Sequence, residues 1–579
     1  MTEHWQDHYQ RWTTFAHLDP ELRAQLDSLR DDPHTLEDCF ARQIEFGTGG
    51  MRGELGPGIN RINLYTVRKA SAGLARYVIG HGQAAMDAGV AIAYDSRHKS
   101  RTFAVEAANV LGWHGIRVHV FDRLCPTPLL SFAVRHLGAF AGIVITASHN
   151  PPEYNGYKVY GADGGQITPA TAEALLKHME EAGDELRIAT ADEPSLRESG
   201  LLRPIGGELL QAYLERLKSC RIPPAVQPAA GDPVRIVFTP LHGTTYEAIT
   251  KGLDAFDYRH VTVVREQADP DPSFSTVSSP NPEEHQAFHL AIQYARKTGA
   301  DLILGTDPDG DRLGVAVKNH QGDYVVLTGN QTGALLLHYL LSQKRKNGAL
   351  PANGVVLKTI VTSEMGRAIA SDFGLVTVDT LTGFKYIGEK IGEFEKTGAY
   401  AFQFGYEESC GFLLADFVRD KDAVQAALFM ADACAFHKSE GRSLYDALLQ
   451  LFATYGYYME DLHAMTCKGK DGMANMASIL SHLRSRPLTE ISGKKVTAVE
   501  DYLAGERRDV AAGTTALLTF PKTDTLKYVL DDESWFCVRP SGTEPKIKLY
   551  FGVKGASLED AEKKLAALKQ AVAHLLENR

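Results

Sequence analysis

The sequence predicts a four-domain α/β protein, with three similar α/β modules on mixed sheets and a smaller C-terminal α+β module, arranged around one central cleft. A chain of 579 residues is too long for a single hydrophobic core. From residue 65 onward, apolar strand patterns alternate with helical patterns, which is typical of βαβ units. The alternation restarts twice, and the last part of the chain differs, so we expect four modules.

The elements of each module follow from these patterns. In the first, helical patterns over 66–87, 102–113 and 129–137 alternate with the strands "GVAIAYD", "IRVHVF" and "AGIVIT". The second module has "VRIVFTP", "HVTVVRE" and "ADLILGT", and the third has "GVVLKTIVT", "GLVTVDT" and "AYAFQFG". The predicted divisions are an N-terminal helical extension (1–45), with Asp19 as a helix N-cap, then domain I (46–207), domain II (208–322), domain III (323–455) and domain IV (456–579), which ends in a helix over 557–577.

Composition narrows the class of protein. The formal net charge of -11 disfavours binding to nucleic acid or to an acidic membrane surface. No apolar stretch is long enough to span a bilayer, and the first residues lack the pattern of a secretory signal. The seven cysteines are scattered without a CxxC pair, which argues against both a disulfide framework and a zinc site. We therefore expect a cytoplasmic protein.

Each module places a polar motif directly after an apolar strand. The four motifs contain Ser148, Asp307, Glu407 and Arg539. Ligands of open α/β sheets bind at the carboxyl ends of strands. We therefore expect the four strand ends to line the same cleft.

The motif "DPDGDR" predicts a metal site. Asp307, Asp309 and Asp311 alternate on a tight turn, so their carboxylates can converge on one hard cation. An EF-hand loop is rejected because Gly310 stands at position 4 and Lys318 at position 12. Three carboxylates leave open positions for water and a phosphoryl oxygen, which suits Mg²⁺.

The segment "SHNPPEYNG" is open to two interpretations. Ser148 is not in a G-x-S-x-G elbow, and Asn, Pro and Gly are turn formers, so the segment fits a plain turn as well as a nucleophile loop. We expect that Ser148 and its neighbour His149 do not form a dyad, because adjacent residues rarely present side chains in that geometry.

Two further motifs suit a phosphorylated sugar. "RPSGTEP" combines an arginine, two hydroxyls and a glycine, as a phosphate-binding loop requires. In "GYEESCG", Glu407 and Ser409 alternate and could hold vicinal hydroxyls. Lys385 in "TGFKYIG" and Lys421 in "RDKDA" fit either ligand contacts or ordinary surface lysines.

The ordered set "TASHNPPEYNGYKVY", "DPDGDR", "TGFKYIG", "GYEES" and "RPSGTEP" resembles the α-D-phosphohexomutase superfamily, over most of the chain from about Gly47 onward. The chain length, "GTGGMRGELGPGINRIN" and "GYEES" are most similar to the phosphoglucomutase/phosphopentomutase branch. "GYEES" departs from the "GGEES" common in relatives.

The resemblance implies roles for individual residues. Ser148 matches the serine that is phosphorylated in the active enzyme, Arg52 an arginine near its phosphate, and Lys158 a general acid/base; His149 is expected to assist as a donor. The metal ligands would be Asp307, Asp309, Asp311 and an oxygen of phosphorylated Ser148. The substrate-binding positions would be Arg312, Thr382, Gly383, Lys385, Glu407, Ser409 and Lys421 around the sugar, and Arg539, Ser541, Gly542 and Thr543 around the remote phosphate.

The implied function is a Mg²⁺-dependent mutase that interconverts α-D-glucose 1-phosphate and glucose 6-phosphate through glucose 1,6-bisphosphate. A phosphopentomutase acting on ribose or deoxyribose 1-phosphate, or a synthase of the bisphosphate, remains an alternative. From other classes, a metal-dependent phosphatase would share Ser148 and the aspartates, and a non-catalytic sugar-phosphate sensor would share the fold. The expected partners are small sugar phosphates, and the expected state is a monomer or a homodimer.

Overall fold

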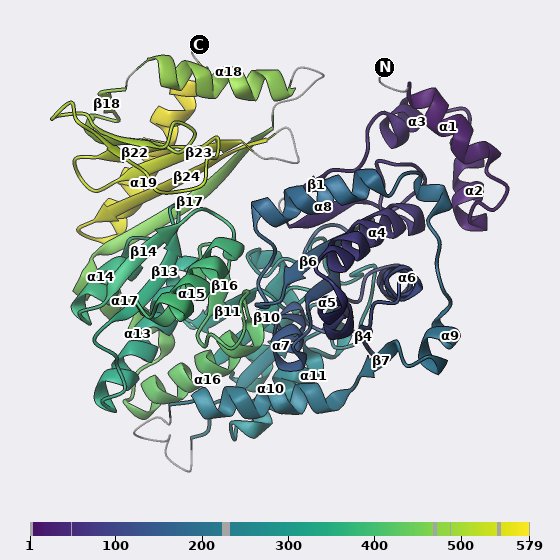
Figure 1. Cartoon of the computed structure of the whole chain (residues 1–579). Coiled ribbons are helices and arrows are strands. Elements are labelled where there is room, and N and C mark those ends of the chain that lie inside the picture. The colour runs from purple at the N-terminus through teal and green to yellow at the C-terminus, as the bar shows by residue number, and fades with distance from the viewer. Residues whose placement is uncertain are drawn as a thin grey trace. The chain divides into compact units, whose positions relative to one another are not determined.

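The computed structural model describes residues 4–47, 49–222, 232–466, 472–486, 488–540 and 546–577. The chain divides into two compact units (Figure 1). Unit 1 comprises Met1–Gly329, Phe384–Gly405 and Ser409–Ser443, and unit 2 comprises Asn330–Gly383, Tyr406–Glu408 and Leu444–Arg579. The division therefore passes through the third predicted module.

Three N-terminal helices, α1 (Trp5–Thr14), α2 (Pro20–Ser28) and α3 (Pro33–Phe40), begin unit 1. Asp19 caps α2, as predicted, by accepting hydrogen bonds from the main-chain N–H of Glu21 and Leu22. The helices share a buried cluster with residues of the following domain, including Tyr65 and Leu186. The segment predicted as an extension is thus packed against the first domain through a buried cluster of its own.

A seven-stranded mixed sheet follows, in the order β1-β2-β6-β5-β3-β4-β7. Strands β3, β4, β5 and β7 run parallel, whereas β6, β2 and β1 add to one side in antiparallel pairs. Helices α6 and α7 both pack on β3 and β5, which are buried along their whole length, and α4 lies beside α8 (Figure 1). The strands are β1 (Phe46–Gly47), β2 (Gly50–Glu54), β3 (Val90–Tyr94), β4 (Val118–Phe121), β5 (Ala141–Ile145), β6 (Tyr154–Gly161) and β7 (Leu202–Ile205).

The helices of this domain largely match the predicted ranges. They are α4 (Leu64–Gly80), α5 (Gln83–Ala88), α6 (Ser100–Trp113), α7 (Thr127–Leu137), α8 (Pro169–Glu181) and α9 (Glu193–Glu198), with a 3₁₀ turn η1 (Glu185–Arg187). The prediction of a single helix over 66–87 was wrong, because Gly82 adopts φ +88° and separates α4 from α5. A left-handed residue cannot continue a right-handed helix.

The second sheet, also in unit 1, has the order β12-β11-β10-β8-β9. Strand β8 pairs in parallel with β9 and β10, whereas β10, β11 and β12 form antiparallel pairs. The β10–β11 hairpin therefore ends in the turn that carries the three aspartates. The elements are α10 (Gly207–Cys220), β8 (Ile236–Thr239), α11 (Tyr246–Ala255), β9 (Val261–Val263), η2 (Arg265–Gln267), η3 (His285–Phe288), α12 (His289–Thr298), β10 (Leu302–Thr306), β11 (Leu313–Lys318) and β12 (Tyr324–Val326).

Elements of the third module occur in both units. Helix α16 (Ala423–Ser439) belongs to unit 1 and is buried from Ala423 to His437, as its apolar residues on every side require. Strands β13 (Gly354–Thr359) and β14 (Val376–Thr380) pair in parallel within unit 2. The remaining elements are α13 (Gly329–Lys346), α14 (Met365–Asp372), α15 (Phe384–Thr397), β15 (Ala401–Glu407), β16 (Gly411–Leu413) and α17 (Leu444–Tyr455).

The C-terminal module is an antiparallel sheet in the order β17-β24-β23-β22-β19-β20-β21, with β18 paired to β19. Its buried face packs against α19 (Leu558–Glu577), close to the predicted range of 557–577. The other elements are β17 (Tyr457–Thr466), α18 (Gly472–Ser485), β18 (Glu490–Ile491), β19 (Lys494–Asp501), β20 (Glu506–Asp509), β21 (Thr515–Leu517), β22 (Leu526–Leu530), β23 (Trp535–Pro540) and β24 (Lys546–Gly555).

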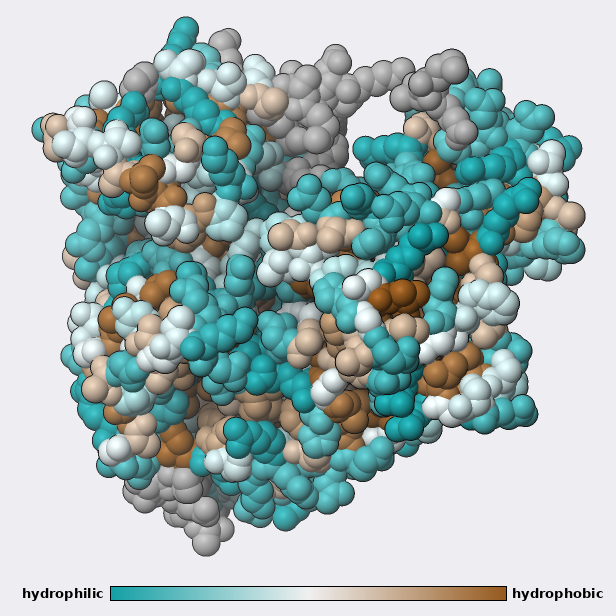
Figure 2. Space-filling model, in the orientation of Figure 1, coloured by the Kyte–Doolittle hydropathy of each residue, from teal (hydrophilic) through white to brown (hydrophobic). Residues whose placement is uncertain are grey.

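Among the described helices, none has the length and apolar character needed to cross a bilayer. On the face shown in Figure 2, hydrophilic residues predominate and the hydrophobic ones lie in small scattered groups. The large apolar residues are instead concentrated in the cores of the modules.

Candidate active site

Ser148 lies on a tight turn directly after β5. Its φ of +54° is left-handed, which costs a non-glycine residue on the order of 1 kcal/mol and is typical of functional turns. The residue is 3% exposed, and its Oγ donates a hydrogen bond to Asp307 Oδ2 at 2.7 Å. The turn and nucleophile interpretations are therefore compatible, because the turn itself directs Oγ toward Asp307 of the β10–β11 turn.

His149 contacts Ser148, contrary to expectation. Its Nδ1 lies 3.2 Å from Ser148 Oγ, a contact that becomes possible because of the left-handed turn between neighbouring residues. Burial, together with the guanidinium groups of Arg312 and Arg52, lowers the pKa of His149 well below its usual value. This shift favours the neutral imidazole, which can still donate one N–H.

The three aspartates of the β10–β11 turn converge as predicted. Asp307, Asp309 and Asp311 are buried, and one carboxylate oxygen from each lies within 4.8 Å of the others. Asp307 Oδ1 accepts the main-chain N–H groups of Asp311 (3.1 Å) and Arg312 (3.0 Å), which holds the turn closed.

This carboxylate cluster fits a divalent cation. Oδ1 of Asp309 and Oδ1 of Asp311 are buried and have no hydrogen-bond partner among the described residues. Unpaired carboxylate oxygens are costly to bury, and a hard cation is the group that would satisfy them.

Two lysines partly offset the negative charge. Lys158 Nζ lies 3.0 Å from Asp309 Oδ2, and Lys421 Nζ lies 3.1 Å from Asp311 Oδ2. Burial and the neighbouring carboxylates of Asp309 and Asp311 raise the pKa of Asp307 well above its usual value. Burial acts in the same direction on Asp309, but the charge of Lys158, the hydrogen bonds with Asp307 and Lys158 and the charge of Lys421 together outweigh it and lower the pKa of Asp309.

Lys158 owes its place to strand pairing. It lies on β6, opposite Val144 of β5 and Gly50 of β2. Because β6 runs antiparallel to β5, a lysine ten residues after Ser148 returns to the same end of the sheet.

The two predicted arginines of unit 1 contact neighbouring side chains. Arg52, on β2, donates to Asn150 Oδ1 at 3.3 Å. Arg312 forms an ion pair with Glu283, and its Nε lies 3.9 Å from Asp311 Oδ1. Arg52 is thus anchored to the turn that carries Ser148, and Arg312 lies beside the turn that carries the three aspartates.

Lys385 and Ser409 also belong to unit 1. Lys385 Nζ lies 5.0 Å from the ring centroid of Tyr386, and Ser409 is half-buried after β15.

In unit 2, one of the predicted sugar-binding residues contacts Glu407. Its Oε1 accepts the main-chain N–H of Gly383 at 2.7 Å, and the carboxylate is buried. Thr382 precedes Gly383, and its buried hydroxyl has no hydrogen-bond partner among the described residues. Arg539 is half-buried near the end of β23. The predicted positions Ser541, Gly542 and Thr543 lie outside the described residues.

The sequence interpretation missed residues that support the loops. Arg97 donates to main-chain carbonyl groups of the segment after Ser148, and Thr127 donates to Asp309. Asp420 accepts hydrogen bonds from Tyr160 and Gln166 and adjoins Lys421. Arg97 follows the end of β3, so the search for polar residues after strands could have found it; Thr127 and Asp420 carry no comparable signal.

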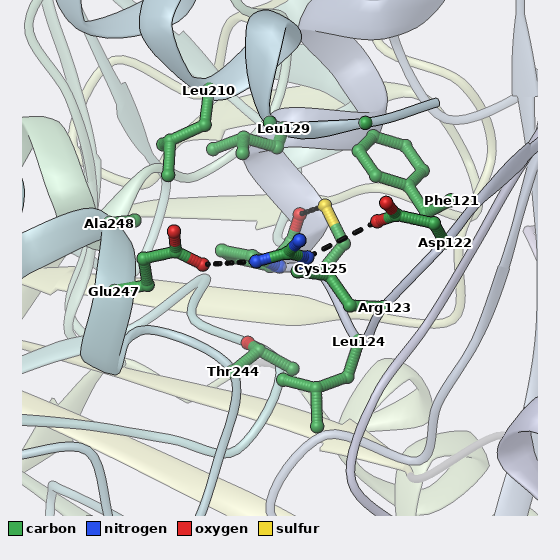
Figure 3. Close-up of a pocket in the computed structure, with 13 residues that line it drawn as sticks. Phe121, Asp122, Arg123, Leu124, Cys125, Leu129, Leu210, Thr244, Glu247 and Ala248 are labelled. Carbon is green, nitrogen blue, oxygen red and sulfur yellow. Dashed lines mark hydrogen bonds and ion pairs between the residues drawn. The ribbon is translucent and has the colours of Figure 1, made fainter. Parts of the chain in front are cut away.

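A pocket in unit 1 lies beside one of these supports (Figure 3). Arg123 lies between Asp122 and Glu247, at 3.2 and 3.3 Å from their carboxylate oxygens. The lining also includes Pro126, which precedes Thr127, and Thr244, which donates to the carbonyl group of Pro308. The guanidinium in this pocket is paired with carboxylates, so the lining is poorly suited to a phosphate.

The chain is similar to known proteins over nearly its full length. Models of the four phosphoglucomutase/phosphomannomutase domains match residues 43–185 (α/β/α domain I), 211–322 (domain II), 328–455 (domain III) and 487–572 (C-terminal domain). A phosphoglucomutase of Staphylococcus aureus (strain MSSA476) is 39% identical over 530 residues, which cover 91% of this chain and 93% of the relative.

Two solved structures share the fold. A phosphoglucomutase/phosphomannomutase family protein of Burkholderia thailandensis matches with a TM-score of 0.66 and 19% identity, over 92% of this chain and 96% of its own. The open form of the phosphoglucomutase parafusin of Paramecium matches with a TM-score of 0.66 and 16% identity, over 93% of this chain and 95% of its own. The predicted four-domain α/β fold class is confirmed, whereas the domain boundaries and the common cleft stay predictions.

Proposed function

The chain belongs to the phosphoglucomutase/phosphomannomutase family, and on that premise we propose that it interconverts α-D-glucose 1-phosphate and glucose 6-phosphate through phosphorylated Ser148 and bound glucose 1,6-bisphosphate. The observation that carries this proposal is the 2.7 Å hydrogen bond from Ser148 Oγ to Asp307, within a buried cluster of three carboxylates. A nucleophile and a cation site in direct contact suit phosphoryl transfer.

Asp307, Asp309 and Asp311, with an oxygen of phosphorylated Ser148, would hold Mg²⁺. The bound ion would supply charge neutralisation to the phosphoryl oxygens. Two carboxylate oxygens of this cluster have no hydrogen-bond partner among the described residues, which supports their assignment as ligands.

The transfer step needs a nucleophile, an acceptor and a proton carrier. The P–O bond to Ser148 Oγ breaks as a P–O bond to the free sugar hydroxyl forms; that hydroxyl loses a proton and Ser148 Oγ gains one. We assign the proton transfer to Lys158, whose ammonium group lies beside the aspartates: it would give a proton to Ser148 Oγ, and the resulting amine would take the proton of the sugar hydroxyl. The bisphosphate then presents its other phosphate, and the same step in reverse regenerates phosphorylated Ser148.

Two side chains would donate to the phosphoryl oxygens during transfer. His149 offers a ring N–H, and Arg52 is held beside the Ser148 turn by its hydrogen bond to Asn150. Fixed donors stabilise a spread negative charge best because they need no reorganisation as the reaction proceeds.

The remaining predicted residues would hold the sugar in either orientation. The carboxylate of Glu407 accepts the main-chain N–H of Gly383. The hydroxyl of Thr382 has no hydrogen-bond partner among the described residues. The proposed sugar contacts are Arg312, Thr382, Gly383, Lys385, Glu407, Ser409 and Lys421, and the proposed contacts to the non-transferred phosphate are Arg539, Ser541, Gly542 and Thr543.

The decisive experiment replaces the nucleophile. Ser148→Ala should lower mutase kcat at least ~10³-fold, and intact-mass analysis of the wild-type enzyme should show a phosphate adduct at Ser148 that excess sugar phosphate removes. Ser199→Ala, an exposed serine of the same unit, is the matched control and should retain normal activity. Near-normal turnover of Ser148→Ala would refute the mechanism.

Substrate preference needs a separate measurement. We expect a higher kcat/KM for glucose 1-phosphate than for ribose 1-phosphate when catalytic glucose 1,6-bisphosphate is supplied, as the 39% identical phosphoglucomutase suggests. The reverse order would indicate a phosphopentomutase. Release of inorganic phosphate as the main product would indicate a phosphatase, and accumulation of the bisphosphate would indicate a synthase.

We place the enzyme in the cytoplasm as a monomer or a homodimer. Scattered cysteines without a CxxC pair support a reducing compartment. Light scattering at two protein concentrations would distinguish the two assembly states.

A further inference from the structure

Arg97 is a buried arginine in unit 1, on the segment after β3. The whole residue is 3% exposed, and its side chain is inaccessible to solvent. Burying a guanidinium group is costly unless its N–H groups are hydrogen-bonded, so its partners indicate the role of this residue.

Its partners lie on the segment after Ser148. Nη2 donates to the carbonyl oxygens of Ser148 (2.6 Å) and Asn150 (2.5 Å), and Nη1 donates to those of Pro151 (2.8 Å) and Tyr154 (3.0 Å). All four N–H groups of the two terminal nitrogens are therefore used on main-chain carbonyl groups of residues 148–154, which we call the serine loop.

The arginine is itself held on two other sides. Asp95 Oδ2 lies 3.4 Å from Nε, and Asp95 Oδ1 accepts the main-chain N–H of Arg97 at 3.0 Å. The ring of Phe274 covers the guanidinium at 5.0 Å from its centroid. The guanidinium group is thus also held by residues outside the serine loop.

A lysine could not replace this arrangement. An ammonium group is one nitrogen with three donors, whereas the planar guanidinium presents separate pairs of donors at fixed spacing. Only the latter can bond four carbonyl groups along one loop at the same time.

We propose that Arg97 is the positioning residue of the serine loop. Its hydrogen bonds hold Ser148 at φ +54° and thereby keep Oγ directed at Asp307. Arg97 bonds only to the main chain of the loop, so it acts through Ser148 and not by contact with the sugar. The expected effect of Arg97 on kcat rests on the proposed function, whereas its effect on the order of the serine loop does not.

Hydrogen–deuterium exchange tests the structural consequence. In Arg97→Lys, the amide groups of residues 147–156 should exchange at least ~10-fold faster than in the wild type, because the loop opens locally. The matched control is Arg117→Lys, since Arg117 also donates to a main-chain carbonyl group, that of Asp87, at an exposed site of the same domain. This control should leave the exchange in residues 147–156 unchanged.

Kinetics test the functional consequence. Arg97→Lys should lower kcat at least ~10-fold through misplacement of the nucleophile, while KM for the sugar phosphate changes less than ~2-fold because uniform substrate binding is retained. Exchange and kcat equal to those of Arg117→Lys would overturn the proposal.

A second variant covers the case in which Arg97→Lys does not fold. Asp95→Asn keeps the guanidinium and removes only the charge facing Nε, so exchange in residues 147–156 should rise by less than in Arg97→Lys but remain above the wild type. No rise in this variant would count against the proposal. Absence of phosphate on wild-type Ser148 would instead refute the proposed function, and the exchange comparison would still decide the role of Arg97.

Discussion

Thr127 donates two hydrogen bonds to Asp309, one from its main-chain N–H to the carbonyl oxygen at 2.8 Å and one from its hydroxyl to Oδ2 at 3.1 Å. Thr127 is the first residue of α7 in domain I, whereas Asp309 belongs to the β10–β11 turn of domain II. One threonine thus fixes both the backbone and the carboxylate of a proposed metal ligand.

Removing that hydroxyl should weaken Mg²⁺ binding. Partners that orient a ligand are typically worth ~10 to 100-fold in metal affinity, so Thr127→Val should raise the Mg²⁺ concentration for half-maximal activity by about 10-fold. Titration calorimetry on the metal-free protein checks the change directly. Thr127→Ser keeps the hydroxyl and should bind Mg²⁺ like the wild type; equal weakening of both variants would contradict the role of the hydroxyl.

Lys421 should stabilise the metal-free chain more than the metal-bound one. Its ammonium group lies 3.1 Å from Asp311 and offsets charge that a bound cation would also offset. In Lys421→Met, Mg²⁺ should therefore raise the melting temperature by about 2 °C or more beyond its effect on the wild type.

Lys438→Met provides the comparison for Lys421. Lys438 pairs with Asp301 at 2.9 Å, and neither residue belongs to the proposed metal site. Its loss should lower the melting temperature equally with and without Mg²⁺. If Mg²⁺ raised the melting temperatures of both variants equally, Lys421 would not offset the negative charge of the proposed metal site.

Asp422 should make stability depend on pH. Burial raises its pKa to about 6, although its carboxylate accepts hydrogen bonds from Tyr213 (2.6 Å) and from the N–H of Gln425 (3.0 Å). Because the folded pKa exceeds the unfolded one, the folded state binds more protons between them, and stability falls as pH rises from about 4 to about 6.

Asp422→Asn removes this dependence. Relative to the wild type, the variant should gain up to about 3 kcal/mol on going from pH 4 to pH 7, which is the value of a two-unit pKa shift. Melting temperatures measured at both pH values check the sign. Asp416→Asn, at an exposed carboxylate of the same loop, should show no such change, and a gain of the opposite sign for Asp422→Asn would contradict the prediction.

Trp12 should be essential for attaching the N-terminal helices. It is fully buried, packs edge-on against Phe40 and Tyr65, and donates from Nε1 to Glu185 at 3.0 Å. Trp12→Ala should cost about 3 to 5 kcal/mol and expose residues 4–44 to limited proteolysis. Trp5→Ala, on the same helix but only half-buried, should have a smaller effect; equal losses would show that the burial of Trp12 is not decisive.

The sequence was sufficient to predict what depends on short stretches. The strands before Ser148 and Asp307 are continuous apolar runs, and such runs with alternating helices indicate a sheet covered on both faces. The aspartates converge because they share one hairpin turn, so their spacing was enough to predict that their carboxylates lie together.

What could not be predicted depends on contacts between distant segments. Thr127 and Asp309 are 182 residues apart, and no local pattern links a helix N-terminus to that turn. The contact of His149 with Ser148 required a left-handed φ at a serine, which propensity disfavours. The N-terminal helices were predicted, but an amphipathic pattern does not say which surface covers the apolar side.

The hydrogen bond between Ser148 and Asp307 also has a consequence for biosynthesis. The two residues are 159 positions apart, so the ribosome releases the nucleophile well before the carboxylates. At about 5 to 20 residues per second, the interval is roughly 8 to 30 s. During that time the nascent chain carries Ser148 without the three aspartates. Under the proposed function, phosphorylation of Ser148 would therefore have to wait for the second domain, and a prematurely terminated chain would be inactive.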